Sequence, residues 1–192
     1  HHDIWDYDVP SQPTFYDVEK DGKIIKALAQ TTKMGFVFLL NRETGEPIFP
    51  VEERDVPQGA VEGDYVTKTQ PFPTKPKPLT PTYLDPDDVF GFTPWDRGYC
   101  KKAAQDLRNE GLYTPPSLEG SVHYPSAIGG ANWGGPAIDS SRNILIANTM
   151  NLSSTIVMVP RSDCDKALKE LARDSVQSRF SALQQNEGTP YC

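Results

Sequence analysis

Residues 36–49, FVFLLNRETGEPIF, contain the clearest indication of the fold. The apolar run 36–40 has the length and composition of a β-strand. The polar residues after it, NRETGEP, include Asn, Thr and Gly, which favour a tight turn. The pair IF then predicts a short returning strand before Pro50. The stretch therefore predicts an antiparallel hairpin.

The flanking sequence repeats this pattern of strands and turns. Residues 24–30 (IIKALAQ) predict a strand before the hairpin, with TTKMG as the loop between them. Much later in the chain, residues 133–160 hold WGGPAID, the polar turn SSRN, ILIAN and STIVMVP, which predict further short strands. We therefore expect a mainly β chain built from repeated antiparallel units.

A long irregular stretch, residues 51–127, lies between the two β regions. Its Pro-rich run 71–81, PFPTKPKPLTP, excludes a helix or a central strand, because proline lacks a backbone N–H and clashes within a helix. A short helix is predicted at 101–111, with Gly111 as its stop. A stretch this long predicts a lid or a packed insertion rather than a simple connection.

The last part of the chain, residues 161–192, has a helical pattern. Ser162 can cap a helix, with acidic residues in the first turn. Apolar residues follow at helical spacing as far as Leu183, and Gly188 and Pro190 end the pattern. We expect a helix appended to the β scaffold.

The composition limits the classes of function. The chain has 192 residues, a formal net charge of −7, 37% hydrophobic residues and 18 prolines. It has no Lys/Arg run that could neutralise phosphates, which argues against a nucleic-acid partner. No apolar stretch reaches the ~20 residues that cross a bilayer, so any membrane anchor is expected outside this chain. Three cysteines fit either inert cytosolic thiols or one disulfide with a spare thiol in a secreted protein.

The first residues, HHDIWDYDVP (1–10), gather groups that bind metals or move protons. A tag remnant, a metal site and a segment of an active site are the three interpretations. Two histidines that run straight into IWDYDVP disfavour a tag. Without a start Met or a signal peptide, the chain is expected to begin within a longer protein. His1 and His2 are expected either in a substrate pocket or in a structural role, and His123 is expected to pack.

Several stretches resemble one enzyme family. LLNRETGEPIF (39–49) resembles the Ala-x-Asp-x-x-Thr-Gly-x-x-x-Trp repeat of quinoprotein propellers, with Thr44 and Gly45 matching. HHDIWDYDVPSQPT resembles the segment with the catalytic Asp in membrane-bound glucose dehydrogenases that depend on pyrroloquinoline quinone (PQQ), and quinate and shikimate dehydrogenases share it. The resemblance continues in order over most of residues 1–160, through TTKMGFVFLLNRETGEPIFPVEE, VPQGAVEGDYVTKTQPFP, GLYTPPSLEGSVHYP and NWGGPAIDSSRNILIANTM.

The resemblance implies part of an eight-bladed β-propeller of four-stranded blades. Two or three blades are expected here, in residues 1–50 with the catalytic loop and in residues 128–160. Residues 51–127 would be the Pro-rich insertion or lid, and 161–192 a helical insertion before the next blade. The chain would then be a fragment of a longer enzyme and inactive by itself.

The resemblance also implies roles for two residues. In this family a base takes the proton of an alcohol as hydride moves to the quinone, and the position of that base matches Asp6. A turn Asp that caps an amide is the alternative. Lys33 in TTKMG matches the lysine at the cofactor, where a fixed cation stabilises the charge of the reduced ring. A solvated loop lysine is the alternative.

Further residues match positions near the quinone or its metal. Asn148 matches a family asparagine, and Asn132-Trp133 resembles the Asn-Trp pair of the alcohol dehydrogenase branch. Glucose dehydrogenases differ at Asn132, and Trp133 fits packing between blades as well as cofactor contact. Asp8 resembles an extra metal ligand of lanthanide-using methanol dehydrogenases. Most ligands of the family's Ca²⁺ or Mg²⁺ are expected outside this chain.

The family's compartment and activity complete these expectations. Cys100 and Cys192 have counterparts in the membrane glucose dehydrogenases, which are periplasmic, and this implies a Cys100–Cys192 disulfide. The parent would be a membrane-associated oxidoreductase that oxidises a sugar, polyol or cyclic alcohol and passes electrons to ubiquinone. A propeller scaffold or binding module without cofactor is the alternative, and it need not keep Asp6 and Lys33 together. A stand-alone sugar-binding domain would need a complete pocket within this chain.

Overall fold

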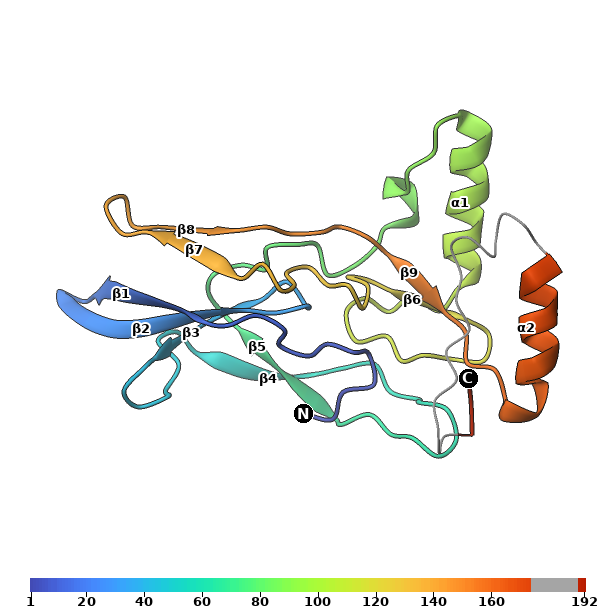
Figure 1. Ribbon diagram of the computed structural model, residues 1–192, viewed down its shortest axis with the longest axis horizontal. Helices are drawn as coiled ribbons and strands as arrows, with labels where there is room; N and C mark the ends of the chain where they lie inside the picture. The colour runs from blue at the N-terminus through green and yellow to red at the C-terminus, as the bar shows by residue number, and fades with distance from the viewer. Residues whose placement is uncertain (174–189) are drawn as a thin grey trace.

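The chain is mainly β, as the sequence predicts, and forms small antiparallel sheets (Figure 1). The computed structural model describes residues 1–173 and 190–192. Its elements are β1 (Thr14–Lys20), β2 (Lys23–Thr31), β3 (Val37–Asn41), β4 (Val51–Asp55), β5 (Thr69–Pro73), η1 (Pro86–Asp88), α1 (Pro94–Asp106), β6 (Ser121–His123), β7 (Pro136–Asp139), β8 (Ile144–Ala147), β9 (Ser154–Ile156), η2 (Arg161–Asp163) and α2 (Cys164–Arg173). One described sheet has the order β1-β2-β3, and three are pairs: β4-β5, β6-β9 and β7-β8. These open sheets are consistent with part of a propeller.

Hydrogen bonds to Asn41 close the turn of the predicted hairpin. After β3 the Asn41 side chain accepts a hydrogen bond from the Glu43 N–H at 2.8 Å. The Gly45 N–H donates to the Asn41 carbonyl at 2.8 Å, with Gly45 at a φ of 80°. The predicted returning strand is reduced to one bridge between Leu40 and Pro47, because proline cannot donate a backbone hydrogen bond.

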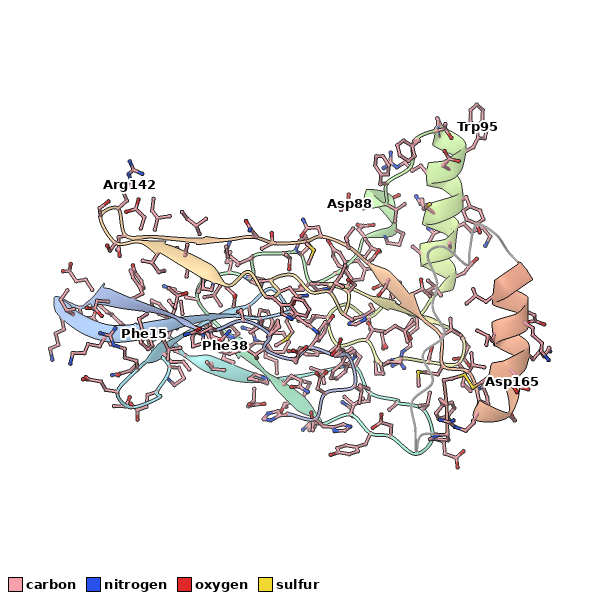
Figure 2. All side chains as sticks on the ribbon, in the orientation of Figure 1. Phe15, Phe38, Asp88, Trp95, Arg142 and Asp165 are labelled. Carbon is pink, nitrogen blue, oxygen red and sulfur yellow. A yellow bond between two sulfur atoms is a disulfide. The ribbon has the colours of Figure 1, made fainter. Side chains whose placement is uncertain are left out.

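The second predicted strand–turn–strand unit forms the β7–β8 hairpin. Its turn places Asn143 at a φ of 59°. The hairpin lies beside β1, where the Thr14 hydroxyl donates to the Pro136 carbonyl at 2.6 Å. Figure 2 shows Arg142 at the free end of this hairpin and Trp95 at the far end of α1, on the opposite side of the molecule.

The helix of the insertion starts earlier than the sequence predicts. Helix α1 begins at Pro94, before the predicted start at residue 101, and it ends before Gly111. The Thr93 side chain accepts a hydrogen bond from the Asp96 N–H at 3.2 Å, and proline fits the first helical turn, so the helix begins at this cap. None of the helices in the described residues combines the length and apolar character that a bilayer crossing requires.

The Pro-rich run is partly a strand. β5 includes Pro71 and Pro73 and pairs with β4 in a two-stranded sheet. Each strand of such a sheet has an open edge, and proline is tolerated there because no second ladder is lost. This agrees with the prediction that the run cannot form a central strand.

One aromatic core lies under the N-terminal segment. Its buried members are Trp5, Tyr7, Phe36, Val56, Leu112 and Tyr113. The rings of Trp5 and Tyr113 meet edge-on, with centroids 5.0 Å apart. Because these side chains come from the N-terminal segment, the hairpin and the insertion, their packing fixes the three parts against one another.

The expected Cys100–Cys192 disulfide is wrong. The structure joins Cys164 to Cys192, with their Cα atoms 6.2 Å apart. Val159 and Cys192 exchange two backbone hydrogen bonds of 2.9 Å, which brings Cys192 beside the start of α2. Cys100 lies on α1, half-buried, and is the free thiol of the described residues. Residues 174–189, in which the predicted helix continues after α2, lie outside the described residues.

Thiol mapping by mass spectrometry should recover this pairing. Without reductant, a maleimide should label Cys100 alone, and reduction should expose Cys164 and Cys192. The crosslinked residues are 28 apart in sequence, so removing the bridge should lower the free energy of unfolding by about 3–4 kcal/mol. A non-reduced peptide that joins Cys100 to Cys192 would contradict the pairing.

Candidate active site

Two aromatic residues anchor the N-terminal segment in the insertion. Trp5 and Tyr7 are 2% and 6% exposed. The Trp5 indole N–H donates to the Thr114 carbonyl at 2.8 Å, and the Tyr7 hydroxyl donates to the Pro125 carbonyl at 2.6 Å. Burial is the main cause that raises the pKa of Tyr7 well above its ordinary value, so the hydroxyl keeps the proton that it donates.

Two carboxylates point outward beside these anchors. The side chains of Asp6 and Asp8 are 69% and 55% exposed. The Asp3 carboxylate fixes the local backbone, since it accepts hydrogen bonds from the N–H groups of Trp5 at 2.9 Å and Tyr7 at 2.7 Å. Asp6 has a φ of 59°, a left-handed conformation that a residue with a side chain keeps only where its surroundings hold it.

Lys33 joins the two carboxylates. Its Nζ donates to Asp6 Oδ2 at 3.1 Å and forms an ion pair with Asp8 Oδ1, while its side chain is 8% exposed. Burial by itself would lower the pKa of Lys33, but the hydrogen bonds and charges of Asp8 and Asp6 raise it above its ordinary value. Lys33 therefore stays charged. An ammonium has three N–H donors, so one remains beyond the two carboxylates.

The loop that holds Lys33 is enclosed by backbone on both sides. The Gly130 N–H donates to the Lys33 carbonyl at 2.6 Å. A Cβ at Gly129 would lie 2.7 Å from Lys33 Cγ, and a Cβ at Gly35 would clash with the Thr80 hydroxyl. Only glycine permits such close approach, so backbone packing sets the position of Lys33.

The segments that contain the other predicted site residues lie beside the Lys33 loop. The Ala131 N–H donates to the Thr32 carbonyl at 3.2 Å. The Met150 N–H donates to the Gly130 carbonyl at 2.8 Å. The structure thus gathers the Lys33 loop, the 129–133 turn and the end of β8, although they are far apart in sequence.

The side chains of the predicted site residues Asn132, Trp133 and Asn148 differ in their hydrogen bonds and their exposure. The Asn132 amide donates to the Ile128 carbonyl at 2.6 Å and accepts from the Trp133 N–H at 2.9 Å, so it is held in its own turn. Trp133 is 83% exposed, and Asn148 is exposed after β8. Trp133 and Asn148 therefore present an indole and an amide at the surface of the described residues.

His123 lies next to this group, although sequence reasoning assigned it only to packing. It is 3% exposed, and neither ring nitrogen has a hydrogen-bond partner among the described residues. Its ring centroid is 4.9 Å from that of Tyr7. Burial lowers the pKa of His123 to about 4, while Asp6 raises it and Lys33 lowers it further. No spacing in the sequence pointed to this contact.

Acid should destabilise the protein through His123. Its folded pKa of about 4 lies below the unfolded value of 6.5, so the unfolded state binds more protons between these values. Stability is therefore lost as the pH falls, by about 3 kcal/mol over this window. Urea unfolding of the wild type and of His123→Phe at pH 7 and pH 4.5 tests this expectation. Each protein gives a change in the free energy of unfolding between the two pH values. Subtracting the change of the variant from that of the wild type removes most of the contribution of carboxylate titration. Equal pH slopes in both proteins would contradict this expectation.

Asp8 does not belong to a metal site within the described residues. No group of three His, Cys, Asp or Glu side chains gathers there closely enough to hold a metal ion. Asp8 pairs with Lys33 instead. A hard cation such as Ca²⁺ takes about six to eight oxygen ligands, so Asp8 could serve one only together with ligands from elsewhere.

A pocket of about 440 Å³ opens beside Asp6. It lies between the N-terminal segment and residues 60–64 of the insertion. Its volume falls in the range of small-molecule sites. Asp6 thus lines a space with the volume of a small-molecule site.

Comparison with known proteins gives a match along the whole chain. A family model described as "PQQ: Glucose/ethanol/alcohol dehydrogenase, beta-propeller domain" matches residues 1–192. Quinoprotein glucose dehydrogenase of Gluconobacter oxydans is 40% identical over 193 residues, which cover 100% of this chain and 24% of that protein. Quinate/shikimate dehydrogenase (quinone) of Acinetobacter baylyi is 32% identical over 192 residues, with the same two coverages.

A third relative is the glycerol dehydrogenase large subunit of Gluconobacter thailandicus. It is 40% identical over 151 residues, which cover 77% of this chain and 20% of that protein. The chain spans about a quarter of the length of the curated relatives that match all of it. No solved structure matches the chain.

Proposed function

Since this chain belongs to the family of PQQ-dependent glucose, ethanol and alcohol dehydrogenase β-propeller domains, we propose that it forms part of an enzyme that oxidises a hydroxyl of a sugar, polyol or cyclic alcohol. The observation that carries the proposal is the contact of the buried Lys33 with the outward carboxylates of Asp6 and Asp8. Oxidation of an alcohol needs a base and a fixed cation at one point. A propeller that serves only as a scaffold needs neither.

Asp6 is the proposed base. Asp6 lines the pocket and its carboxylate is exposed, so a substrate hydroxyl can reach it, and the hydrogen bond from Lys33 orients one of its oxygens. Asp6 accepts the proton of the substrate hydroxyl. At the carbon that bears this hydroxyl, the C–H bond breaks and a C=O bond forms. PQQ, when bound, supplies the acceptor of the hydride. The exposed carboxylate can then return its proton to solvent.

The residues around Lys33 fit an anionic, flat quinone. The remaining N–H of Lys33 and the exposed amide of Asn148 can donate to quinone oxygens, and a charge held in place there stabilises a developing oxyanion. The exposed indole of Trp133 can stack on a flat ring. Asn132 would contribute only after it leaves the hydrogen bonds of its own turn.

A cation is part of the proposed site. The carboxylates of Asp6 and Asp8 would repel an anionic cofactor if Lys33 alone balanced them. Ca²⁺ or Mg²⁺ beside Asp8, with ligands from outside this chain, would remove that repulsion. Asp8 is therefore the proposed contribution of this chain to the metal.

The surroundings of the enzyme are proposed from the resemblance. The parent would be periplasmic and anchored to the inner membrane outside this chain, in an eight-bladed propeller of which the described sheets form parts of two or three blades. Ubiquinone is the proposed electron acceptor, supported by the word quinone in the name of the Acinetobacter relative.

The test uses a full-length protein that contains this chain, reconstituted with PQQ and Ca²⁺. Dye reduction with glucose, other aldoses, glycerol, quinate and simple alcohols should identify one class of oxidised substrate. Cofactor binding is measured separately by equilibrium dialysis of PQQ. Absence of both binding and turnover would overturn the proposal and favour the scaffold.

A further inference from the structure

The pocket beside Asp6 has two polar walls and an apolar floor. One wall is the N-terminal segment, and the other is the glycine-containing loop 59–65 of the insertion. The floor residues are Ile4, Pro116, Ala127, Ile156 and Met158. A mostly apolar site with a few polar groups is typical of small-molecule pockets.

His2 ties the two walls together. Its Nε2 lies 2.9 Å from Asp64 Oδ1, and its ring stacks on Tyr65 with centroids 4.1 Å apart and planes inclined by 8°. The start of the same loop is held by Arg108, which donates to the Gly59 carbonyl at 2.9 Å. Loop 59–65 is thus fixed at both ends, and His2 is its link to the segment that contains Asp6.

Of the Asp, Glu, Lys and Arg residues, the described lining of this pocket holds only the acidic ones. These are Asp3, Asp6, Glu62 and Asp64. Among the described residues, the cation beside Asp6 is Lys33, which already contacts two carboxylates. Carboxylates accept hydrogen bonds from substrate hydroxyls, whereas a substrate carboxylate placed here would meet like charge.

We infer that loop 59–65, positioned by His2, is the substrate-binding wall beside Asp6 and selects neutral polyhydroxy substrates over substrates that bear a carboxylate. This inference rests on the proposed function. The names of the relatives do not decide it, because they include both glucose and quinate dehydrogenases. The charge of the wall decides it. Specificity is the difference between two binding free energies, and like charge makes binding of the substrate with a carboxylate less favourable.

The first test reverses one charge of the wall. In the full-length enzyme loaded with PQQ and Ca²⁺, kcat/KM should be higher for neutral glucose or glycerol than for quinate. Glu62→Lys should raise the quinate-to-neutral ratio of kcat/KM by about tenfold or more. Glu53→Lys is the matched control, because Glu53 is also exposed but lies outside this pocket, where its carboxylate contacts His1. It should leave the ratio unchanged.

The second test removes the contacts of His2 with loop 59–65. His2→Ala should raise KM for the neutral substrate about tenfold and leave kcat within about twofold, because substrate contacts weaken while Asp6 and Lys33 stay in place. His2→Gln can still donate to Asp64 and should restore most of the affinity. His1→Ala, which removes the neighbouring contact with Glu53, should change neither constant. A general folding defect would lower kcat as well and would also appear in His2→Gln.

The outcomes separate this inference from the proposed function. Turnover on quinate equal to that on neutral substrates overturns the inference alone, and so does an unchanged ratio in Glu62→Lys or an unchanged KM in His2→Ala. An enzyme that binds PQQ but oxidises none of these substrates overturns the proposed function, and the inference falls with it.

Discussion

Asp6→Asn should lower kcat of the full-length enzyme by about 10²–10⁴-fold, the usual contribution of a positioned base. The amide has the shape of the carboxylate but cannot take the hydroxyl proton. Asparagine also tolerates the left-handed backbone at a φ of 59° better than most residues, so the fold should be kept. Dye reduction at saturating substrate, with PQQ and Ca²⁺ in excess, measures the effect.

The control for this substitution is Asp17→Asn. Asp17 is also an exposed carboxylate that contacts a cation, Arg42, at 2.6 Å, but it lies on β1 away from the pocket. Exposed ion pairs contribute about 0–1 kcal/mol to stability, so this variant should keep both its stability and its kcat. Full activity of Asp6→Asn would show that the base is another residue. A similar loss in Asp17→Asn would show that the effect is not specific.

Gly35→Ala should destabilise the protein more than Gly45→Ala. The two glycines have nearly the same φ, 78° and 80°, so the left-handed backbone costs each alanine about 1–2 kcal/mol. A Cβ at Gly45 meets nothing within 4 Å, whereas a Cβ at Gly35 would clash with the hydroxyl of Thr80. Crowding of this kind adds about 1–3 kcal/mol, which brings the loss at Gly35 to about 2–5 kcal/mol.

Urea unfolding of the two purified variants tests this difference, and PQQ affinity gives a second measurement. Because Gly35 and Lys33 share one loop, Gly35→Ala should also weaken cofactor binding, while Gly45→Ala should not. Equal losses of stability would show that Thr80 moves aside without cost. Unchanged cofactor affinity in Gly35→Ala would show that the loop does not fix Lys33.

The elements that the sequence predicted are those with local causes. The hairpin between β3 and the returning residues at Pro47 follows from an apolar run and a turn that Asn41 and Gly45 close. β1 was missed, although the Asp21-Gly22 pair before β2 is a common turn between strands. The start of α1 was missed in the same way, since Thr93 and Pro94 form an ordinary helix cap.

Local sequence patterns predicted less of the candidate site than of the fold. Asp6 and Lys33 lie 27 residues apart, and only the family resemblance connected them before the structure brought them to 3.1 Å. The disulfide was mispaired because the partner of Cys192 depends on backbone pairing with Val159, which is a tertiary contact. His123 occupies a buried place that no periodicity marks.

The anchoring of Trp5 and Tyr7 bears on how enzymes of this kind can diversify. The carbonyls that receive them, those of Thr114 and Pro125, belong to the irregular stretch rather than to a sheet. That stretch therefore supports the N-terminal segment that contains Asp6. A chimera that exchanges residues 111–125 between relatives without residues 3–8 would replace Leu112 and Tyr113, whose side chains pack in one core with Trp5 and Tyr7, so the two segments should be exchanged together.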